Sequence, residues 1–315
     1  MTQKLLERKE KLPKEPRERL GGGGWKDLNA KLLDFLHSLC FIGPSFFGVL
    51  LFFIIPFGVV VYYSLIKSPL DPEFAGITNF INLFKNSAFR MAARNTLVFA
   101  AVSVPLAVVM ALCLALLLEA RIPLKSQFRT FFLSPMMVPV ASIVLIWQVI
   151  FHANGALNEV LSVFGMKAVD WFKSDYSLVV VLTLFLWKNL GYNMILFMAA
   201  LSNIPKELLE VADVEGAGPV YKFFAIKLRY LSPTVLFVTI LSLINSFKVF
   251  REVYLLTGDY PYETLYMLQH FMDNTFKSLD YQKLSAAAVV MALVMVIIIA
   301  VLFKVEDWFG KDVEG

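Results

Sequence analysis

The sequence is poor in the residues that build disulfide frameworks and metal sites. Its 315 residues include two cysteines, Cys40 and Cys113, and three histidines, His37, His152 and His270. The histidines are scattered without ligand spacing, and each cysteine lies beside or inside an apolar segment. We therefore expect neither a disulfide scaffold nor a bound metal.

The sequence also lacks the motifs of an enzyme. The run Gly21–Gly24 before Trp25 and Lys26 is without the G-x4-G-K-[ST] frame of a phosphate loop, and no strand precedes it. No nucleophile stands with a base, and no acidic or histidine motif lies at a membrane interface. We expect a protein that catalyses nothing and binds no cofactor. Residues 1–30 are polar and have no early apolar stretch, so they do not form a cleavable signal.

Apolar residues dominate what is present. They make up 58% of the chain, with 29 phenylalanines and a mean hydropathy of +0.67. A soluble domain of this size cannot hide so much apolar surface, so the composition predicts a polytopic protein in contact with membrane lipid. The net charge of +4 is modest and calls for no nucleic-acid partner.

Six apolar segments are long enough to cross a bilayer, which takes about 20 residues. They predict an all-α membrane domain over 41–304, between a cytoplasmic tail at 1–40, whose residues 26–40 could form an interfacial helix, and another tail at 305–315. Pro135 and Pro139 predict a kink in the third span. The spans are expected near 41–66, 94–118, 129–151, 177–201, 231–250 and 284–304.

The distribution of Lys and Arg predicts the orientation of the chain in the membrane. With a cytoplasmic N-terminus, the segments on the cytoplasmic side hold twice as many of these residues as the outer segments. Both termini and the polar insert before the fifth span are therefore expected in the cytoplasm.

That polar insert, at 205–233, has a helical pattern of its own. Pro205 suits the first turn of a helix that Ser202 or Asn203 could cap. Gly216 and Gly218 are expected to end this helix, and Pro219 can start a second one. The alternative is an amphipathic interfacial helix, but such a helix has no need of the glycine elbow.

The spacing of charged and small residues in this insert resembles the EAA loop of binding-protein-dependent ABC importer permeases. Val211 stands where that family prefers alanine, and Arg229 where proline is usual. The resemblance implies a type I importer permease fold with a coupling loop at 205–230, which docks on an ATPase subunit. The loop residues that it assigns to this docking are Glu210, Ala212, Glu215, Gly216 and Ala217.

Shorter fragments extend the resemblance toward the carbohydrate subfamily, of the maltose and glycerol-phosphate type. Asn154–Asn158 resembles its "G-x-L-N" stretch, and Phe250 with Leu256 and Thr257 resembles its "F-D-x-x-x-x-L-T", with Arg251 in place of the aspartate. The family's partners are a second homologous permease, two cytoplasmic ATPases that bind the ATP, and an extracytoplasmic solute-binding protein. The implied location is the inner, or cytoplasmic, membrane, and the implied substrate is a sugar.

Polar residues inside the fourth and fifth spans are the candidates for a substrate path, because each is costly in lipid. Trp187, Tyr192 and Phe247 could add an aromatic platform for a sugar. Alternatively, Asn and Ser side chains tie helices together, and the lysine pairs with a carboxylate of the partner permease. The candidates are Lys188, Asn189, Gly191, Asn193, Ser242, Asn245 and Ser246.

Two other interpretations remain open at this stage. Within the family, the cargo could be glycerol phosphate, another phosphate, a polyamine or an amino acid. Outside it, an ion-coupled secondary transporter would need carboxylates in the membrane, whereas Glu119 and Glu252 lie only at the ends of spans.

Overall fold

The computed structural model describes residues 41–119 and 123–310, and the elements in these ranges are helices apart from one isolated bridge between Ile66 and Phe74. Five helices are long and apolar enough to cross a membrane, and a sixth span results if one bent pair is counted as one. The predicted all-α, six-span architecture is thereby confirmed. The candidate spans are Phe41–Leu65, Ser87–Glu119, Ser177–Ser202, Pro219–Thr257 and Tyr281–Trp308, with the pair Lys125–Met137 and Val140–Ile150.

The chain divides into two compact units, 1–59 and 60–315. The described part of the first unit is an apolar helical segment that includes a π-helical turn, η2 (Leu50–Ile54), and the start of α2 (Ile55–Leu65). The predicted tail at 1–40 lies outside the described residues, as do the last five residues of the predicted tail at 305–315. All following elements belong to the second unit.

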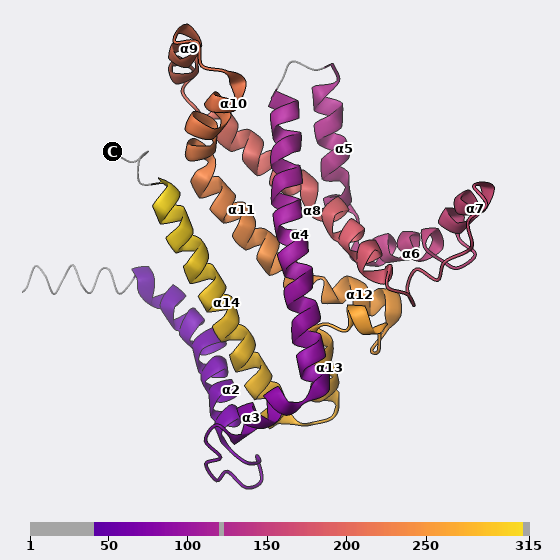
Figure 1. The fold of residues 1–315 in the computed structure, drawn as a ribbon. Coiled ribbons are helices and arrows are strands. Elements are labelled where there is room, and N and C mark those ends of the chain that lie inside the picture. Colours follow the sequence, from indigo (N-terminus) through magenta and orange to yellow (C-terminus); the bar gives the residue numbers. More distant parts are fainter. Residues whose placement is uncertain (1–40, 120–122, 311–315) are drawn as a thin grey trace, which may run out of the picture. The chain divides into compact units, whose positions relative to one another are not determined.

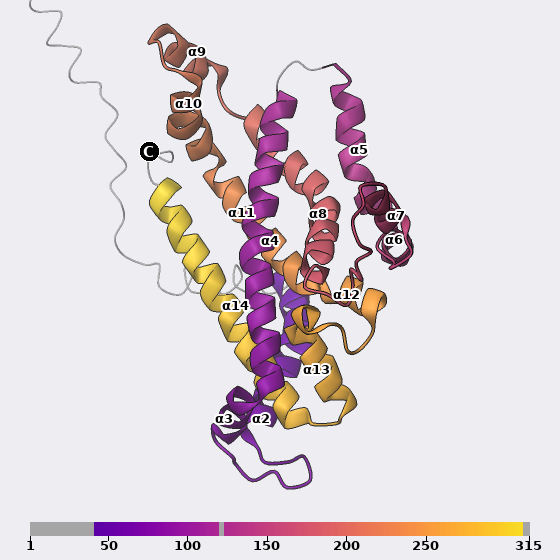
Figure 2. The same cartoon turned by 45° about the vertical axis from the view of Figure 1, so that its right-hand side comes forward.

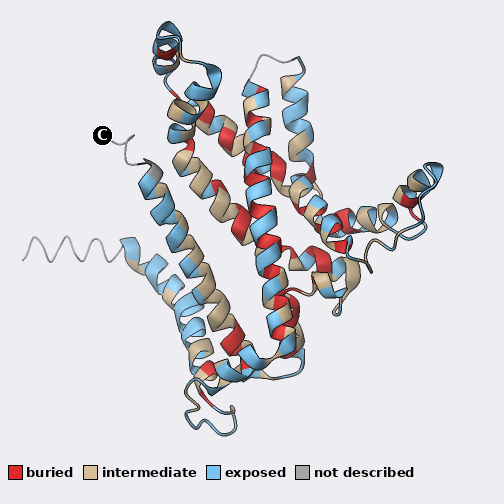
Figure 3. Ribbon diagram, in the orientation of Figure 1, coloured by how far each residue is buried: buried red, intermediate tan, exposed pale blue. Residues whose placement is uncertain are grey.

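The centre of the second unit is the contact of α4 (Ser87–Glu119) with α8 (Ser177–Ser202) and α11 (Leu228–Lys248) (Figure 1). Ala107, Ala111 and Ala115 recur every fourth residue on α4 and are fully buried. Small residues at this spacing let helix backbones approach closely in a membrane. Buried residues accordingly run along α4, α8 and α11 in Figure 3, whereas much of α14 (Tyr281–Gly310) is exposed.

The helices alternate in direction between two ends of this unit (Figures 1 and 2). One end holds the C-terminal ends of α4, α8 and α14 with the short helices α9 (Lys206–Val214) and α10 (Pro219–Lys222). Near the other end, α3 (Thr78–Lys85) and α13 (Leu268–Lys277) pack with the first turns of α4 and α14. The connection between α11 and α13 contains α12 (Phe250–Thr257) and the 3-10 turn η4 (Glu263–Leu265).

The third predicted span, 129–151, is two helices rather than one. α5 (Lys125–Met137) and α6 (Val140–Ile150) meet at an angle of 100°. Pro139 is the N-cap of α6 and has no N–H to continue the hydrogen bonding of α5. The expected kink is therefore a sharp break, and it falls at the second of the two prolines.

Asn158 organises the connection between α6 and α8, which contains α7 (Ala156–Val163). Its buried side-chain amide donates to three carbonyl oxygens, and its Oδ1 accepts from the backbone of Val169 and from Trp171 Nε1, at 3.1 Å each. At Gly155 a Cβ would lie 2.4 Å from the carbonyl oxygen of Val149. In the Asn154–Asn158 stretch, Asn158 and Gly155 therefore serve the local structure of this connection.

Candidate functional site

The polar insert contains the predicted first helix as α9, but its start differs from the expectation. Pro205 is the N-cap residue rather than the first helical residue. Ser202 ends α8 with its hydroxyl donating to Ala199, and Asn203 is the C-cap of α8, so neither caps α9. The prediction failed because α8 extends to Ser202 and uses both residues for its own end.

The glycine elbow after α9 is a Schellman motif. Gly216 has φ +76°, its N–H donates to the carbonyl of Asp213, and the N–H of Ala217 donates to the carbonyl of Ala212 at 2.8 Å. Gly218 is different, since its φ of −67° is open to any residue. Gly216 alone therefore supplies the left-handed turn, although the sequence pattern favoured both glycines.

The second helix of the insert begins at Pro219, as predicted, but it is not a separate short helix. α10 passes through a π-helical turn, η3 (Phe223–Lys227), directly into α11. The second helix of the insert is therefore continuous with the fifth span.

The insert is attached to the bundle by apolar contacts and ion pairs. Ala212 is buried, and Leu209 packs against the cluster that joins α4, α8 and α11. Asp213 pairs with Lys222 across the elbow. At the base of the insert, Lys227 Nζ lies 2.6 Å from Glu119 Oε2 at the end of α4.

The opposite face of the insert is exposed and partly apolar. Val214 is 90% exposed, and Val211, Val220 and Tyr221 are exposed as well. Among the predicted docking residues, Glu210, Glu215 and Gly216 are exposed, Ala217 is half-buried and Ala212 is buried. The extra bulk of Val211 thus lies on the outer face of α9.

A cavity of about 710 Å³ opens between α8, α11 and α12. Of the seven predicted substrate-path residues, Lys188, Asn189 and Asn245 line it. Tyr192 is the one member of the predicted aromatic platform at its wall, because Trp187 stacks on Trp147 and Phe247 packs toward α14. The other lining residues are Met136, Leu184, Phe185, Leu241, Lys248, Val249, Phe250, Arg251, Glu252 and Gln269.

An ion pair between Lys188 and Glu252 lies at the wall of this cavity. Glu252 is 4% exposed, and its Oε2 has no hydrogen-bond partner among the described residues. The carboxylate that pairs with Lys188 thus comes from this chain, rather than from a partner permease as the alternative interpretation held. Sequence reasoning placed Glu252 at a span end, and no sequence signal links residues so far apart.

The amide side chains divide between the cavity and the packed interior. Asn245 Nδ2 donates to Asn189 Oδ1 at 2.9 Å, at the cavity wall. In contrast, Asn193 donates to Ser242 Oγ at 2.9 Å, and both residues are almost fully buried. Ser246 is also buried, with its hydroxyl donating to the carbonyl of Leu243. In this structure the Asn193–Ser242 hydrogen bond joins α8 to α11, as the alternative interpretation describes. The hydroxyl of Ser246 is hydrogen-bonded within its own helix.

Gly191 lies at a backbone contact between α8 and α5 rather than at the cavity. A Cβ there would stand 1.9 Å from the carbonyl oxygen of Phe132 and 3.0 Å from the N of Leu133. Only glycine permits this approach.

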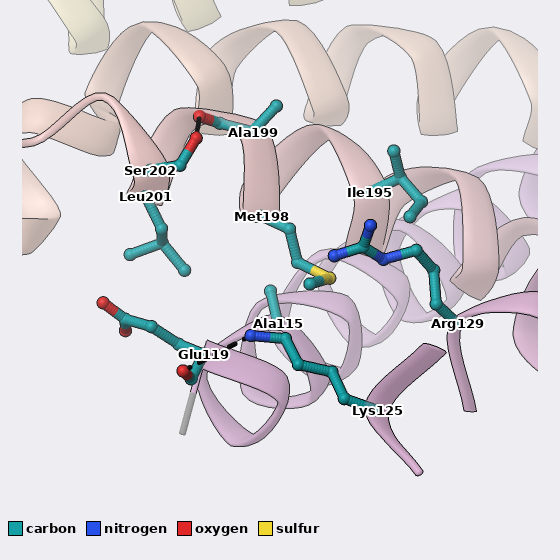
Figure 4. Close-up of a pocket in the computed structure, with 9 residues that line it drawn as sticks. All are labelled: Ala115, Glu119, Lys125, Arg129, Ile195, Met198, Ala199, Leu201 and Ser202. Carbon is teal, nitrogen blue, oxygen red and sulfur yellow. Dashed lines mark hydrogen bonds between the residues drawn. The ribbon is translucent and has the colours of Figure 1, made fainter. Parts of the chain in front are cut away.

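A second cavity, of about 320 Å³, lies where α4 ends and α5 begins, beside the last turns of α8. Figure 4 shows Lys125 and Arg129 of α5 with Glu119 of α4 around it, and Lys125 Nζ donates to the carbonyl of Glu119 at 3.5 Å. Sequence reasoning missed this cavity, although the i, i+4 spacing of its two cations is visible in the sequence.

The loop beyond α12 carries the clearest pKa shifts. Lys277 Nζ lies 2.5 Å from Asp259 Oδ1, and the pair lowers the pKa of Asp259 and raises that of Lys277. Burial lowers the pKa of His270 to about 4 against the pull of Asp273 and Asp259. His270 Nδ1 accepts a hydrogen bond from the N–H of Met267, which requires an unprotonated Nδ1. No cluster of three potential metal ligands occurs among the described residues.

Known proteins resemble this chain over most of its length. A family profile described as "Binding-protein-dependent transport system inner membrane component" matches residues 103–315. The sulfoquinovosyl glycerol transport system permease protein SmoG of Agrobacterium fabrum is 30% identical over 288 residues, 89% of this chain and 92% of that protein. The sn-glycerol-3-phosphate transport system permease protein UgpA of Yersinia pestis is 28% identical over 262 residues, covering 81% and 88%.

A solved structure has the same fold. A chain of the bacterial alginate ABC transporter, in complex with a periplasmic protein bound to alginate pentasaccharide, matches with a TM-score of 0.76 at 21% identity. The match covers 92% of this chain and 99% of that chain.

Proposed function

Because the chain belongs to the family of binding-protein-dependent transport system inner membrane components, we propose that it forms one half of the membrane pathway of an ATP-driven importer for a sugar or oligosaccharide. The family is one of transporter permeases, so the chain is a membrane protein that moves a solute. The observation that carries the proposal is the elbow at Gly216, which holds an exposed helix against the bundle.

The coupling step follows from how this helix is attached. Closure of two ATPase subunits around ATP pushes on α9 through its exposed face, which includes Glu210 and Val211. The Schellman turn and the Asp213–Lys222 ion pair resist bending. The push therefore reaches α11 through α10 and η3, and reaches α4 through the Lys227–Glu119 ion pair. ATP is bound by the ATPases and not by this chain.

The cargo assignment is supported by the named relatives, whose names give a sulfoquinovosyl glycerol and a glycerol phosphate as their substrates. An extracytoplasmic binding protein delivers the sugar to the outer side, and a second homologous permease completes the path. Glycerol phosphate, amino acids and polyamines are the remaining alternative cargoes. Because the chain belongs to this family, the interpretation as an ion-coupled secondary transporter is no longer needed.

The orientation places α9, α10 and the end of α14 in the cytoplasm, with both termini on that side. This orientation is supported by the twofold excess of Lys and Arg on the segments assigned to the cytoplasmic side. The end of α14 also lies at the same end of the bundle as the start of α11, since residues of both line a cavity of about 440 Å³. The membrane is the inner, or cytoplasmic, membrane.

Reconstitution with the second permease, the ATPase and the binding protein encoded by neighbouring genes tests the proposal. We expect ATP-dependent uptake of a sugar into proteoliposomes and ATPase activity that is stimulated by the loaded binding protein. Glu210→Gln should abolish the stimulation while membrane insertion is retained, and Glu207→Gln, one turn earlier on α9 and also exposed, serves as the matched control. Uptake by this chain without ATPase or second permease would refute the proposal.

A further inference from the structure

We infer that the cavity between α8, α11 and α12 selects cargo with an anionic group, so that the imported sugar is an acidic glycoside or a sugar ester of a strong acid. This inference rests on the proposed function and adds the substrate class. It is carried by the charges at the cavity wall.

Four charged side chains line the cavity, and their charges do not balance. Lys188, Lys248 and Arg251 are cations, and Glu252 is the one anion among them. The Lys188–Glu252 ion pair cancels one charge of each sign. The side chains of Lys248 and Arg251 make no ion pair or hydrogen bond with any residue in the described part of the chain. Two uncompensated positive charges therefore remain at one wall.

These two cations are exposed at the end of the fifth span, where they line the cavity. Lys248 ends α11 and Arg251 lies in the first turn of α12. Ionisable residues at cavities of a membrane bundle mark the path of ions or charged substrates. A wall with an excess of one sign also raises the local concentration of oppositely charged solutes. A neutral sugar would gain hydrogen bonds but no charge attraction from this wall, whereas a carboxylate, sulfonate or phosphate would gain both.

The same cavity offers partners for the hydroxyl groups of a sugar. Asn189 and Asn245 lie at its wall with Tyr192 and Gln269. The cavity thus combines a region for an anion with groups for a polyol, and its volume of about 710 Å³ suits a small glycoside.

A two-charge substitution tests the inference in the complete importer. The variant Lys248→Gln/Arg251→Gln is compared with the unmodified chain and with Lys248→Arg/Arg251→Lys, which keeps both charges. The matched control is Lys85→Gln/Lys173→Gln, which removes two exposed cations that do not line this cavity. Size-exclusion profiles and thermal unfolding establish that each variant assembles.

Uptake is measured in proteoliposomes with saturating binding protein, so that the maximal rate reports on the membrane path rather than on capture. The probes are matched pairs, cellobiouronic acid with cellobiose and glycerol 3-phosphate with glycerol, together with any sugar that raises the unfolding temperature of the binding protein. We expect an acidic member to be transported. Its maximal rate should fall about tenfold in the Gln variant, since charge attraction in a confined site is strong, and stay within about twofold in the Arg/Lys variant and the control.

Two results would overturn the inference and leave the proposed function in place. One is uptake that is confined to neutral sugars, and the other is an acidic cargo whose maximal rate is the same in the Gln variant. The second result would mean that the two cations pair with the second permease or serve packing. If no solute is taken up in an ATP-dependent manner, the proposed function itself fails and the inference with it.

Discussion

Replacement of Gly216 by alanine isolates the turn that follows α9, the helix proposed to couple to the ATPase. The φ of +76° lies in the left-handed region, where a residue with a Cβ loses about 1–2 kcal/mol. No atom lies within 4 Å of the position that a Cβ would take, so the whole cost comes from the backbone and none from a clash. Gly216→Asn should cost less, because asparagine tolerates this conformation. Gly216→Pro should remove the turn, since proline fixes φ near −65° and has no N–H for Asp213.

Gly218 provides a matched control two residues away. It also has open space around its Cβ position, but its φ is −67°. Gly218→Ala should therefore be neutral, or stabilising by about 0.5 kcal/mol, because alanine restricts the unfolded chain. The assays are the apparent unfolding temperature of the purified complex and the ATPase rate with loaded binding protein.

The expected order of stimulated ATPase activity is wild type equal to Gly218→Ala, then Gly216→Asn, Gly216→Ala and Gly216→Pro. We expect a loss of about 5- to 30-fold for Gly216→Ala, since a cost of about 1–2 kcal/mol changes a population by that factor. Equal losses at both glycines would refute the reasoning, because the two positions differ only in backbone conformation. Full uptake by Gly216→Pro would show that the elbow has no part in coupling.

Three further predictions follow from packing and burial. Gly191→Ala should lower the apparent unfolding temperature by several degrees, because its Cβ would stand 1.9 Å from the carbonyl oxygen of Phe132; an unchanged temperature would contradict the close contact of α5 and α8. Asn158→Ala should cost about 3 kcal/mol and speed proteolysis between α6 and α8, since it leaves several buried backbone groups unpaired. His270 is neutral in the folded chain down to a pH of about 4 but charges near 6.5 when unfolded, so the unfolded state binds more protons between these values. Stability should therefore fall by about 3 kcal/mol as the pH drops from 6.5 to 4, and His270→Asn should flatten this dependence in thermal unfolding at a series of pH values.

The backbone of the polar insert at 205–233 was largely predictable because its determinants are local. Proline and glycine fix backbone angles wherever they occur, so Pro219 and Gly216 marked a helix start and a helix end before any contact was known. The capping residues of α9 were not predictable in the same way. Ser202 and Asn203 suit either end of a helix, and the length of α8 decides between them. Whether Glu210 docks on an ATPase stays a prediction.

The membrane cavity was less predictable, since periodicity gives a helix face but not its neighbour. Asn189 and Asn193 are one turn apart on α8, yet the first lies at a cavity and the second is buried against Ser242. The partner of Lys188 is 64 residues away, at a position that appeared to be a span end. Gly191 resembled a polar-path residue because it stands among asparagines, whereas its neighbour is a backbone carbonyl.

The seam at Gly191 also limits how the protein can move. Because no side chain separates α5 from α8 at Gly191, a small sliding motion would bring a neighbouring Cβ into contact with the carbonyl of Phe132. The two helices are therefore expected to move together as one rigid body. Relative motion of helices during transport is then expected at less closely packed contacts, such as the one between α11 and the last turns of α14, where a cavity lies.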